Sequence, residues 1–266
     1  MAQEKWLVED AKVIDVGLVR KLKVGLIAGK VDIIGHDEPT AHIEVHSVSG
    51  KALKVSIDGD TLEIDHPQLS WDNWIDVFKS FRGNAKADIS IMVPRDIELK
   101  FGVVSATALV SGLTEDASIS TVSGDVVVDN LYGDLQLNGV SGEIAVRNHY
   151  GEITAKTISG DITASGEIMK FTGNSVSGDI FLDVTGTPDE ITASTVSGGI
   201  TTRLAPGVAA QYKLNTVSGR IQLDDAEIKG VHGGYTGKYG ALDKTWLEFR
   251  ANTVSGSISV LHAVSA

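Results

Sequence analysis

The stretch GEIAVRNHYGEITAKTISGDI, residues 142–162, contains the same short phrase three times. Gly142, Gly151 and Gly160 are each followed by an acidic residue and then an isoleucine. The first and third glycines follow Val-Ser and Ile-Ser, whereas the middle one follows His-Tyr, so the full period runs from Gly142 to Gly160 and holds two apolar runs and two glycine corners. Such a period is typical of proteins in which each repeat stacks on the next.

The period extends on both sides of this stretch. The residue before each Ser-Gly pair recurs at steps of 18 and then of 20, 21 and 37: Val122, Val140, Ile158, Val176, Val196, Val217 and Val254. When the chain is written in rows of one period, three apolar columns align: Val126 with Ile144, Ile162 and Ile180; Val128 with Val146, Ala164 and Leu182; Leu135 with Ile153 and Phe171. The alternate positions are mostly polar, which predicts strands with one buried and one solvent-facing side.

These patterns predict an all-β fold, a right-handed parallel β-solenoid with about 18–21 residues per coil. The repeated glycines are expected at corners whose backbone angles only glycine adopts without strain. The doubled step between Val217 and Val254 predicts an insertion between two coils.

The N-terminal zone, residues 1–110, lacks this register but still has the pattern of strands. Asp58-Gly59, between two alternating runs in residues 54–66, predicts an antiparallel hairpin. We expect a single domain over residues 1–266, with an irregular, partly antiparallel β zone at 1–110 and an aromatic insert at 67–86. The solenoid repeats then occupy 111–262, with a glycine-rich insert at 225–243.

Composition and charge restrict the class of protein. The chain has 266 residues, no cysteine and a formal net charge of −12, which opposes binding to nucleic acid and to anionic surfaces. The start, MAQEKWLVEDAK, has acids where a signal peptide needs a basic region, and the apolar run at 24–35 is too short to cross a bilayer. The sequence therefore predicts a cytoplasmic protein without an integral membrane segment.

The repeated polar residues are the first candidates for a site. Asp125, Glu143, Asp161 and Asp179 should form one column, but a calcium ion needs six to eight oxygen ligands, so solvated edge residues are the favoured interpretation. The repeated serines lack matching histidines and are expected to make corner hydrogen bonds. His36, His42 and His46 show no metal-site motif. We predict no catalytic residue, no metal and no cofactor.

One segment differs from the rest of the chain. Residues 70–81, SWDNWIDVFKSF, contain the candidate binding residues Trp71, Trp74, Phe78 and Phe81. Ser70 is suited to a helix N-cap, and the first three aromatic residues follow the spacing of one helical face. Two interpretations stay open: a short helix that caps the solenoid, or a docking patch for a membrane protein or a bilayer interface.

The Val-Ser-Gly-Asp repeats, together with EKWLVED, KVGLIAGKVDIIGHDE, EVHSVSG, LEIDHPQLSWDN and GVVSATALVSGL, resemble a known family. The chain is similar to actinobacterial members of the putative-adhesin, β-strand-repeat family of unknown function, within the toast-rack group. The resemblance covers nearly the whole chain and implies a β-solenoid without established catalytic residues. Relatives in this family are often joined to membrane helices and linked to envelope-stress systems.

The sequence thus favours a non-enzymatic scaffold or interaction module with a role in envelope-stress signalling. Its partner is an unidentified protein, a membrane protein being one option, and self-association through the solenoid ends stays open. The alternative is a module that binds carbohydrate or another extended polymer on a Thr/Ser-rich face. A polysaccharide-active enzyme ranks third, because that face lacks the two facing carboxylates that glycoside hydrolysis commonly needs.

Overall fold

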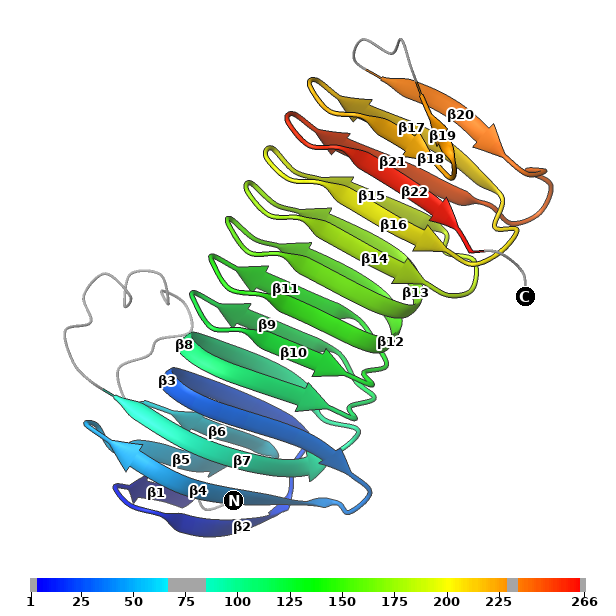
Figure 1. Ribbon diagram of the computed structural model, residues 1–266. Helices are drawn as coiled ribbons and strands as arrows, with labels where there is room; N and C mark the ends of the chain where they lie inside the picture. Colours follow the sequence, from blue (N-terminus) through cyan, green and yellow to red (C-terminus); the bar gives the residue numbers. More distant parts are fainter. Residues whose placement is uncertain (1–3, 67–84, 229–233, 264–266) are drawn as a thin grey trace. The chain divides into compact units, whose positions relative to one another are not determined.

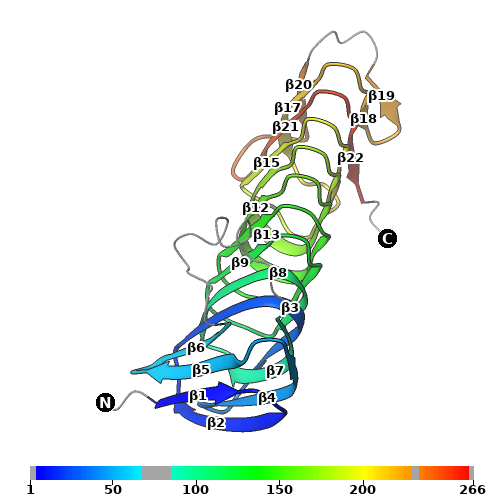
Figure 2. The same cartoon turned by 90° about the vertical axis from the view of Figure 1, so that its left-hand side faces the viewer.

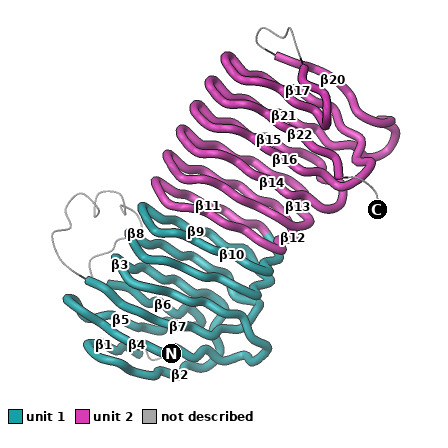
Figure 3. Tube along the Cα trace, viewed as in Figure 1, with its two compact units in different colours: residues 1–133 teal, residues 134–266 magenta. Residues whose placement is uncertain are grey.

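The computed structural model describes residues 4–66, 85–228 and 234–263, and every regular element within these ranges is a β-strand (Figure 1). The predicted all-β class is therefore confirmed. The chain divides into two compact units, residues 1–133 and 134–266 (Figure 3). Each unit has its own pair of sheets and its own apolar core.

Unit 1 contains two sheets that share the long strands β3 (Lys21–His36) and β8 (Glu98–Ser111). In one sheet the strand order is β1 (Glu4–Val8), β5 (Leu53–Asp58), β6 (Thr61–Asp65), the first parts of β3 and β8, and β9 (Ala117–Thr121). In the other it is β2 (Lys12–Leu18), β4 (Thr40–Ser49), β7 (Lys86–Pro94), the second parts of β3 and β8, and β10 (Val126–Asp129).

The pairing in unit 1 changes from antiparallel to parallel along each sheet. The β5–β6 hairpin is antiparallel, as predicted from Asp58-Gly59, and its two-residue turn is Gly59-Asp60, with Asp58 opposite Thr61 and a positive φ at Gly59. β3 then pairs with β6, β7 and β8 in parallel. The parallel pairing therefore begins at Lys21, well before the zone in which the repeat is visible in the sequence.

Unit 2 is a stack of coils, each with one strand in either sheet (Figure 2). One sheet is ordered β11 (Leu135–Gly139), the second parts of β12 (Ile144–Lys156) and β13 (Ile162–Asn174), β15 (Glu190–Ser194), β21 (Leu247–Thr253), β17 (Ala210–Thr216) and β20 (Tyr235–Tyr239). The other is ordered β12 and β13 (first parts), β14 (Ile180–Val184), β16 (Ile200–Leu204), β22 (Ile258–His262), β18 (Ile221–Leu223) and β19 (Ala226–Glu227).

The coils of unit 2 do not stack in sequence order. The coil formed by β21 and β22 lies between the β15/β16 coil and the β17/β18 coil, because β21 pairs with both β15 and β17. β20 then covers the outer edge of β17 as an antiparallel strand. The predicted insertion between Val217 and Val254 is present, but the simple sequential stacking that we expected is wrong.

The predicted apolar columns are buried. In unit 2, Ile162 pairs with Ile144 on one side and Ile180 on the other, and its side chain is 0% exposed. Phe171 is equally buried and pairs with Ile153. Val126 is also buried, as a member of unit 1. The alternation that the sequence shows is therefore the alternation between core and solvent.

The predicted need for backbone angles that only glycine adopts is confirmed at the Ser-Gly corner of Gly142, which has a positive φ, but not at three later corners. Gly160, Gly178 and Gly198 do not have a positive φ. Instead, a Cβ on Gly178 would lie 2.1 Å from the carbonyl oxygen of Gly160, and one on Gly198 would lie 2.2 Å from that of Gly178. Glycine recurs here because neighbouring corners stack too closely for any side chain, whereas Gly133 and Gly151 of the half-repeat do have a positive φ.

Candidate functional site

The aromatic candidates Trp71, Trp74, Phe78 and Phe81 lie outside the described residues. The choice between a cap and a docking patch therefore stays a prediction. The structure instead draws attention to the Val-Ser-Gly corners of unit 2, where the repeated acids, hydroxyls and apolar residues come together.

The repeated acids accept hydrogen bonds from the backbone of the next coil. Oδ1 of Asp161 accepts from the Asp179 amide at 2.9 Å, and Oδ1 of Asp179 accepts from the Gly199 amide at 2.7 Å. Each carboxylate thus accepts a hydrogen bond from a backbone amide that is not paired with a neighbouring strand. Among the described residues, no group of three or more His, Cys, Asp or Glu side chains is placed to hold a metal ion.

At several corners, hydroxyl groups make hydrogen bonds on the inner or the outer side, whereas the buried Ser175 Oγ of the Val176 corner has no hydrogen-bond partner in the described part of the chain. The inner hydroxyl accepts from the glycine amide, as in Gly160 N to Thr157 Oγ1 at 3.1 Å, and Thr253 also donates to the Gly198 carbonyl at 3.0 Å. The outer serine donates to the carbonyl of the preceding coil, as Ser159 does to Val140 at 3.2 Å. The predicted role of these serines as corner hydrogen-bonding groups is confirmed at these positions.

Between the two hydroxyls, five corners direct one branched apolar side chain to solvent. We call these five residues the apolar ridge: Ile158, Val176, Val196, Val254 and Val217, which are 52, 50, 49, 47 and 77% exposed. Their order follows the stacking of the coils, because Ser177 donates to Ile158, Ser197 to Val176, Ser255 to Val196 and Ser218 to Val254. Neighbouring members are therefore one strand spacing apart, ~4.8 Å.

Two polar columns accompany the ridge. Two residues before each ridge residue, the corresponding side chains are Lys156, Asn174, Ser194, Asn252 and Asn215, and Asn215 donates to Asn252 at 2.8 Å. Three residues after the ridge residue lie the acids Asp161 and Asp179, then Gly199, Ser257 and Arg220. An apolar strip with polar borders is the pattern of an interaction surface rather than of a solvated strand face.

Comparison with known protein families finds a match for this chain. The Toastrack DUF4097 family model matches residues 19–261, which is most of the chain. The chain belongs to the Toastrack DUF4097 family. The resemblance to the toast-rack group that the repeats indicated is thereby confirmed. No curated protein matches this toastrack chain in sequence.

Several solved structures are similar to this toastrack chain at low identity. A putative adhesin from Bacteroides fragilis is 14% identical, with 95% of this chain and 98% of that chain covered and a TM-score of 0.45. A putative lipid binding protein from Parabacteroides distasonis is 13% identical, with coverages of 95% and 97% and a TM-score of 0.46. A putative cell adhesion protein from Clostridium sporogenes is 13% identical, with coverages of 96% and 100% and a TM-score of 0.34.

The three histidines of the N-terminal zone have separate partners. His36 Nε2 lies 2.9 Å from the Thr40 carbonyl, His42 Nδ1 lies 2.5 Å from Asp15, and His46 Nε2 lies 2.8 Å from Ser90 Oγ. Each imidazole therefore has a different hydrogen-bond partner in unit 1.

Sequence reasoning missed a partly buried group of hydrogen-bonded side chains in the toastrack coils of unit 2. Tyr212 Oη lies 3.0 Å from His262 Nε2, and His262 Nδ1 lies 3.0 Å from Asp224 Oδ2. The ring of Tyr239 stacks on His262 with centroids 3.7 Å apart. Burial, followed by the charge of Asp224, raises the pKa of the Tyr212 hydroxyl, so the phenol stays protonated. These hydrogen bonds join β22 to the β17/β18 coil.

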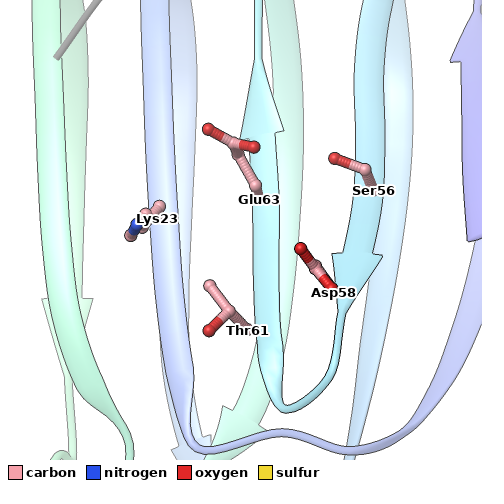
Figure 4. A pocket seen from close by; sticks show the side chains of 5 residues that line it. All are labelled: Lys23, Ser56, Asp58, Thr61 and Glu63. Atoms are coloured by element: carbon pink, nitrogen blue, oxygen red, sulfur yellow. The ribbon is translucent and has the colours of Figure 1, made fainter. Parts of the chain in front are cut away.

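Unit 1 has a small polar hollow of about 180 Å³ on the outer side of β3, β5 and β6 (Figure 4). Lys23, Ser56, Asp58, Thr61 and Glu63 line it. None of these residues is a histidine, so neither hydroxyl has an imidazole base among the lining residues. The lining is polar, as on the solvent-facing side of a sheet.

His66 is a buried histidine whose pKa is far from its ordinary value. Its side chain is 0% exposed, and Nδ1 accepts the Ile27 amide at 3.4 Å. Burial, with a smaller contribution from Lys51, lowers the pKa of His66 to about 4. The ring is thus neutral in the folded protein at neutral pH and acts in packing.

Within the described ranges, no helix is long and apolar enough to cross a membrane.

Proposed function

We propose that this toastrack protein is a non-catalytic interaction module and that the apolar ridge of unit 2 is its binding surface. The observation that carries the proposal is the stacking of five half-exposed branched side chains in one line. A single exposed valine on a protein surface needs no explanation, but a continuous apolar strip is an unusual surface for a protein with this acidity.

The side chains of the ridge residues take no part in the hydrogen bonds of the corners. The inner hydroxyl, the outer serine and the glycine make the hydrogen bonds and the close contacts of the corner. A polar residue in the place of Val176 or Val196 would leave all of them in position. The apolar character of these side chains is therefore better explained by a contact with a partner than by the stability of the coil.

The test uses a triple variant, Val176→Thr, Val196→Thr and Val254→Thr, which keeps the β-branched shape and removes apolar surface. The matched control is Val13→Thr with Leu18→Thr, two residues of similar exposure on β2 of unit 1. We expect both variants to melt like the wild type. Proteins recovered from native cells with the wild type should be lost with the ridge variant and kept with the control. Identical recovery with all three would overturn the proposal.

Four expectations from the sequence are also part of this proposal. These are a scaffold role in envelope-stress signalling, a partner that is itself a membrane protein, a cytoplasmic location and a single domain. The right-handed sense of the coils is supported by the general preference of parallel crossover connections for that hand.

The second candidate function is binding of an extended polymer such as a carbohydrate. The regular column of Asn174, Ser194, Asn252 and Asn215 favours it, because it presents hydrogen-bonding groups at a constant spacing. If this alternative is correct, Asn252→Ala should weaken retention on immobilised polysaccharides, whereas the ridge variant should not.

A further inference from the structure

We infer that the partner of the apolar ridge is an amphipathic α-helix of another polypeptide, with basic residues beside its apolar stripe. This inference rests on the proposed function and specifies the class of partner. Three features of the corners support it: the hydrogen bonding of the ridge backbone, the spacing of the ridge residues and the charge beside them.

The main-chain carbonyl groups of the inner ridge residues are not available to a partner strand. The carbonyl groups of Ile158, Val176 and Val196 already accept the serine amides of the next coil, at 2.8, 2.9 and 3.0 Å. A partner that adds a strand to a sheet needs unpaired backbone groups along the edge that it joins. A helix satisfies its own backbone and needs only side-chain contacts, so it is suited to a ridge of this kind.

The spacing of the ridge also agrees with a helix. Ridge residues recur every ~4.8 Å, the separation of adjacent strands. Residues three and four apart on one helical face are separated by about 4.5 and 6 Å along the axis, whereas same-face residues of a strand are about 6.6 Å apart. The five ridge residues span four intervals, ~19 Å, which corresponds to a helix of about 13 residues.

A single line of side chains is complementary to a helix surface. Rows of side chains on a helix leave grooves between them, and the packing of a ridge into such a groove is the common mode of helix association. A partner helix with small residues in its groove would therefore bring its larger apolar side chains against both flanks of Val176, Val196 and Val254.

The charge beside the ridge specifies the flanking residues of the helix. Asp161 and Asp179 lie three residues after Ile158 and Val176, at one end of the ridge, whereas Arg220 lies in the same column at the Val217 end and Lys156 in the opposite column. Each acid uses Oδ1 for a backbone amide, but a carboxylate remains charged and can accept further bonds through its other oxygen. Lys or Arg on the part of the helix beside Asp161 and Asp179 is complementary to these two acids, and the net charge of −12 opposes an anionic bilayer.

The test measures the binding of labelled synthetic peptides to the full chain by fluorescence anisotropy. The first peptide is a helix former of about 14 residues with a Leu/Ala stripe flanked by Lys, long enough to follow the whole ridge. The second has Glu in place of Lys, and the third has the composition of the first with two prolines that prevent a helix. Vesicles of zwitterionic and of anionic lipid are the other probes.

We expect the Lys peptide to bind the wild type, and the ridge variant Val176→Thr, Val196→Thr, Val254→Thr to bind it at least tenfold more weakly. Asp161→Asn with Asp179→Asn should also weaken binding and reduce its dependence on salt. The Val13→Thr, Leu18→Thr control should bind like the wild type. The bound peptide should become helical by circular dichroism.

Three results would overturn the inference. They are equal binding of the Glu or proline peptide, binding of vesicles that depends on the ridge, and Lys-peptide binding that the ridge variant retains. If no peptide binds while the ridge variant still loses its native partners, the helical partner is wrong but the ridge remains the binding surface. If native partners are also retained, the proposed function itself fails.

Discussion

Replacing Gly178 with alanine is expected to destabilise unit 2, because the lack of a Cβ allows neighbouring coils to approach. An alanine Cβ at this position would lie 2.1 Å from the carbonyl oxygen of Gly160. Ordinary contact begins at 3.4 Å, so the two corners would have to separate by about 1.3 Å. The obstacle is backbone rather than a flexible side chain, so no rotamer change relieves it.

This separation would break hydrogen bonds that cross the corner. Ser177 N donates to the Ile158 carbonyl at 2.8 Å, and Asp179 N donates to Asp161 Oδ1 at 2.9 Å. Both would be stretched beyond hydrogen-bonding distance. Each lost bond costs about 0.5–1.5 kcal/mol, and both donors belong to residues exposed to solvent. Since alanine also restricts the unfolded chain, which returns about 0.4–1 kcal/mol, we expect a net loss of about 1–2.5 kcal/mol.

The assay is urea unfolding together with calorimetry, in which a loss of this size lowers Tm by roughly 2–10 °C. The matched control is Gly199→Ala, one residue from the next corner. Its Cβ would meet only Ser257 O at 3.6 Å and Asp179 Oδ1 at 3.7 Å, and its φ is not positive. We expect the control to stay within about 0.5 kcal/mol of the wild type. Equal stability of all three proteins, or equal losses in both variants, would refute the stacking argument.

Three further predictions concern pH, calcium and the aromatic segment. His66, with a folded-state pKa of about 4, stays neutral where the unfolded chain takes up a proton, so stability should fall by up to roughly 3 kcal/mol as pH drops from about 6.5 to 4. Asp65, whose pKa is raised chiefly by burial, acts in the opposite sense, so His66→Gln is compared with the wild type at each pH, and an unchanged acid sensitivity would contradict the assignment. Because Asp161 and Asp179 bind backbone amides, Tm should be indifferent to calcium or a chelator; a calcium-dependent rise that is lost in Asp125→Asn, Glu143→Gln, Asp161→Asn would show otherwise. Replacing Trp71, Trp74 and Phe78 with Ser should lower Tm if the segment is a cap, or remove partners without lowering Tm if it is a docking patch; no change in either would exclude both interpretations.

The sequence by itself determined the period, the strand class and the buried columns. Ile144, Ile162 and Ile180 pair as the repeat period predicted, because alternation along a strand is local and survives in any stack of this kind. The hairpin predicted from Asp58-Gly59 could also be recognised in the sequence, since a turn depends on two residues and their neighbours. The repeated serines were identified as corner groups for the same reason.

Only part of the candidate site could be predicted from the sequence. Ile158, Val176 and Val196 marked the repeat, but an apolar residue beside a glycine corner gave no indication that it faces solvent. The hydroxyl before it, Thr157 in the first of these corners, is the residue that could have shown this. Because that hydroxyl must point inward to bind the Gly160 amide, the next side chain must point outward.

Only the tertiary structure shows the order of the coils and the reason why glycine is required at the corners. The sequence places residues 247–262 last, yet β21 and β22 lie inside the stack, because a strand pairs with whichever neighbours offer complementary edges and not with the one that precedes it in the chain. Tyr212, His262 and Asp224 hold that arrangement through contacts between residues far apart in the chain. The close approach of Gly178 to Gly160 likewise exists only between coils, so no pattern within a single repeat could show that space, and not backbone angle, requires glycine there.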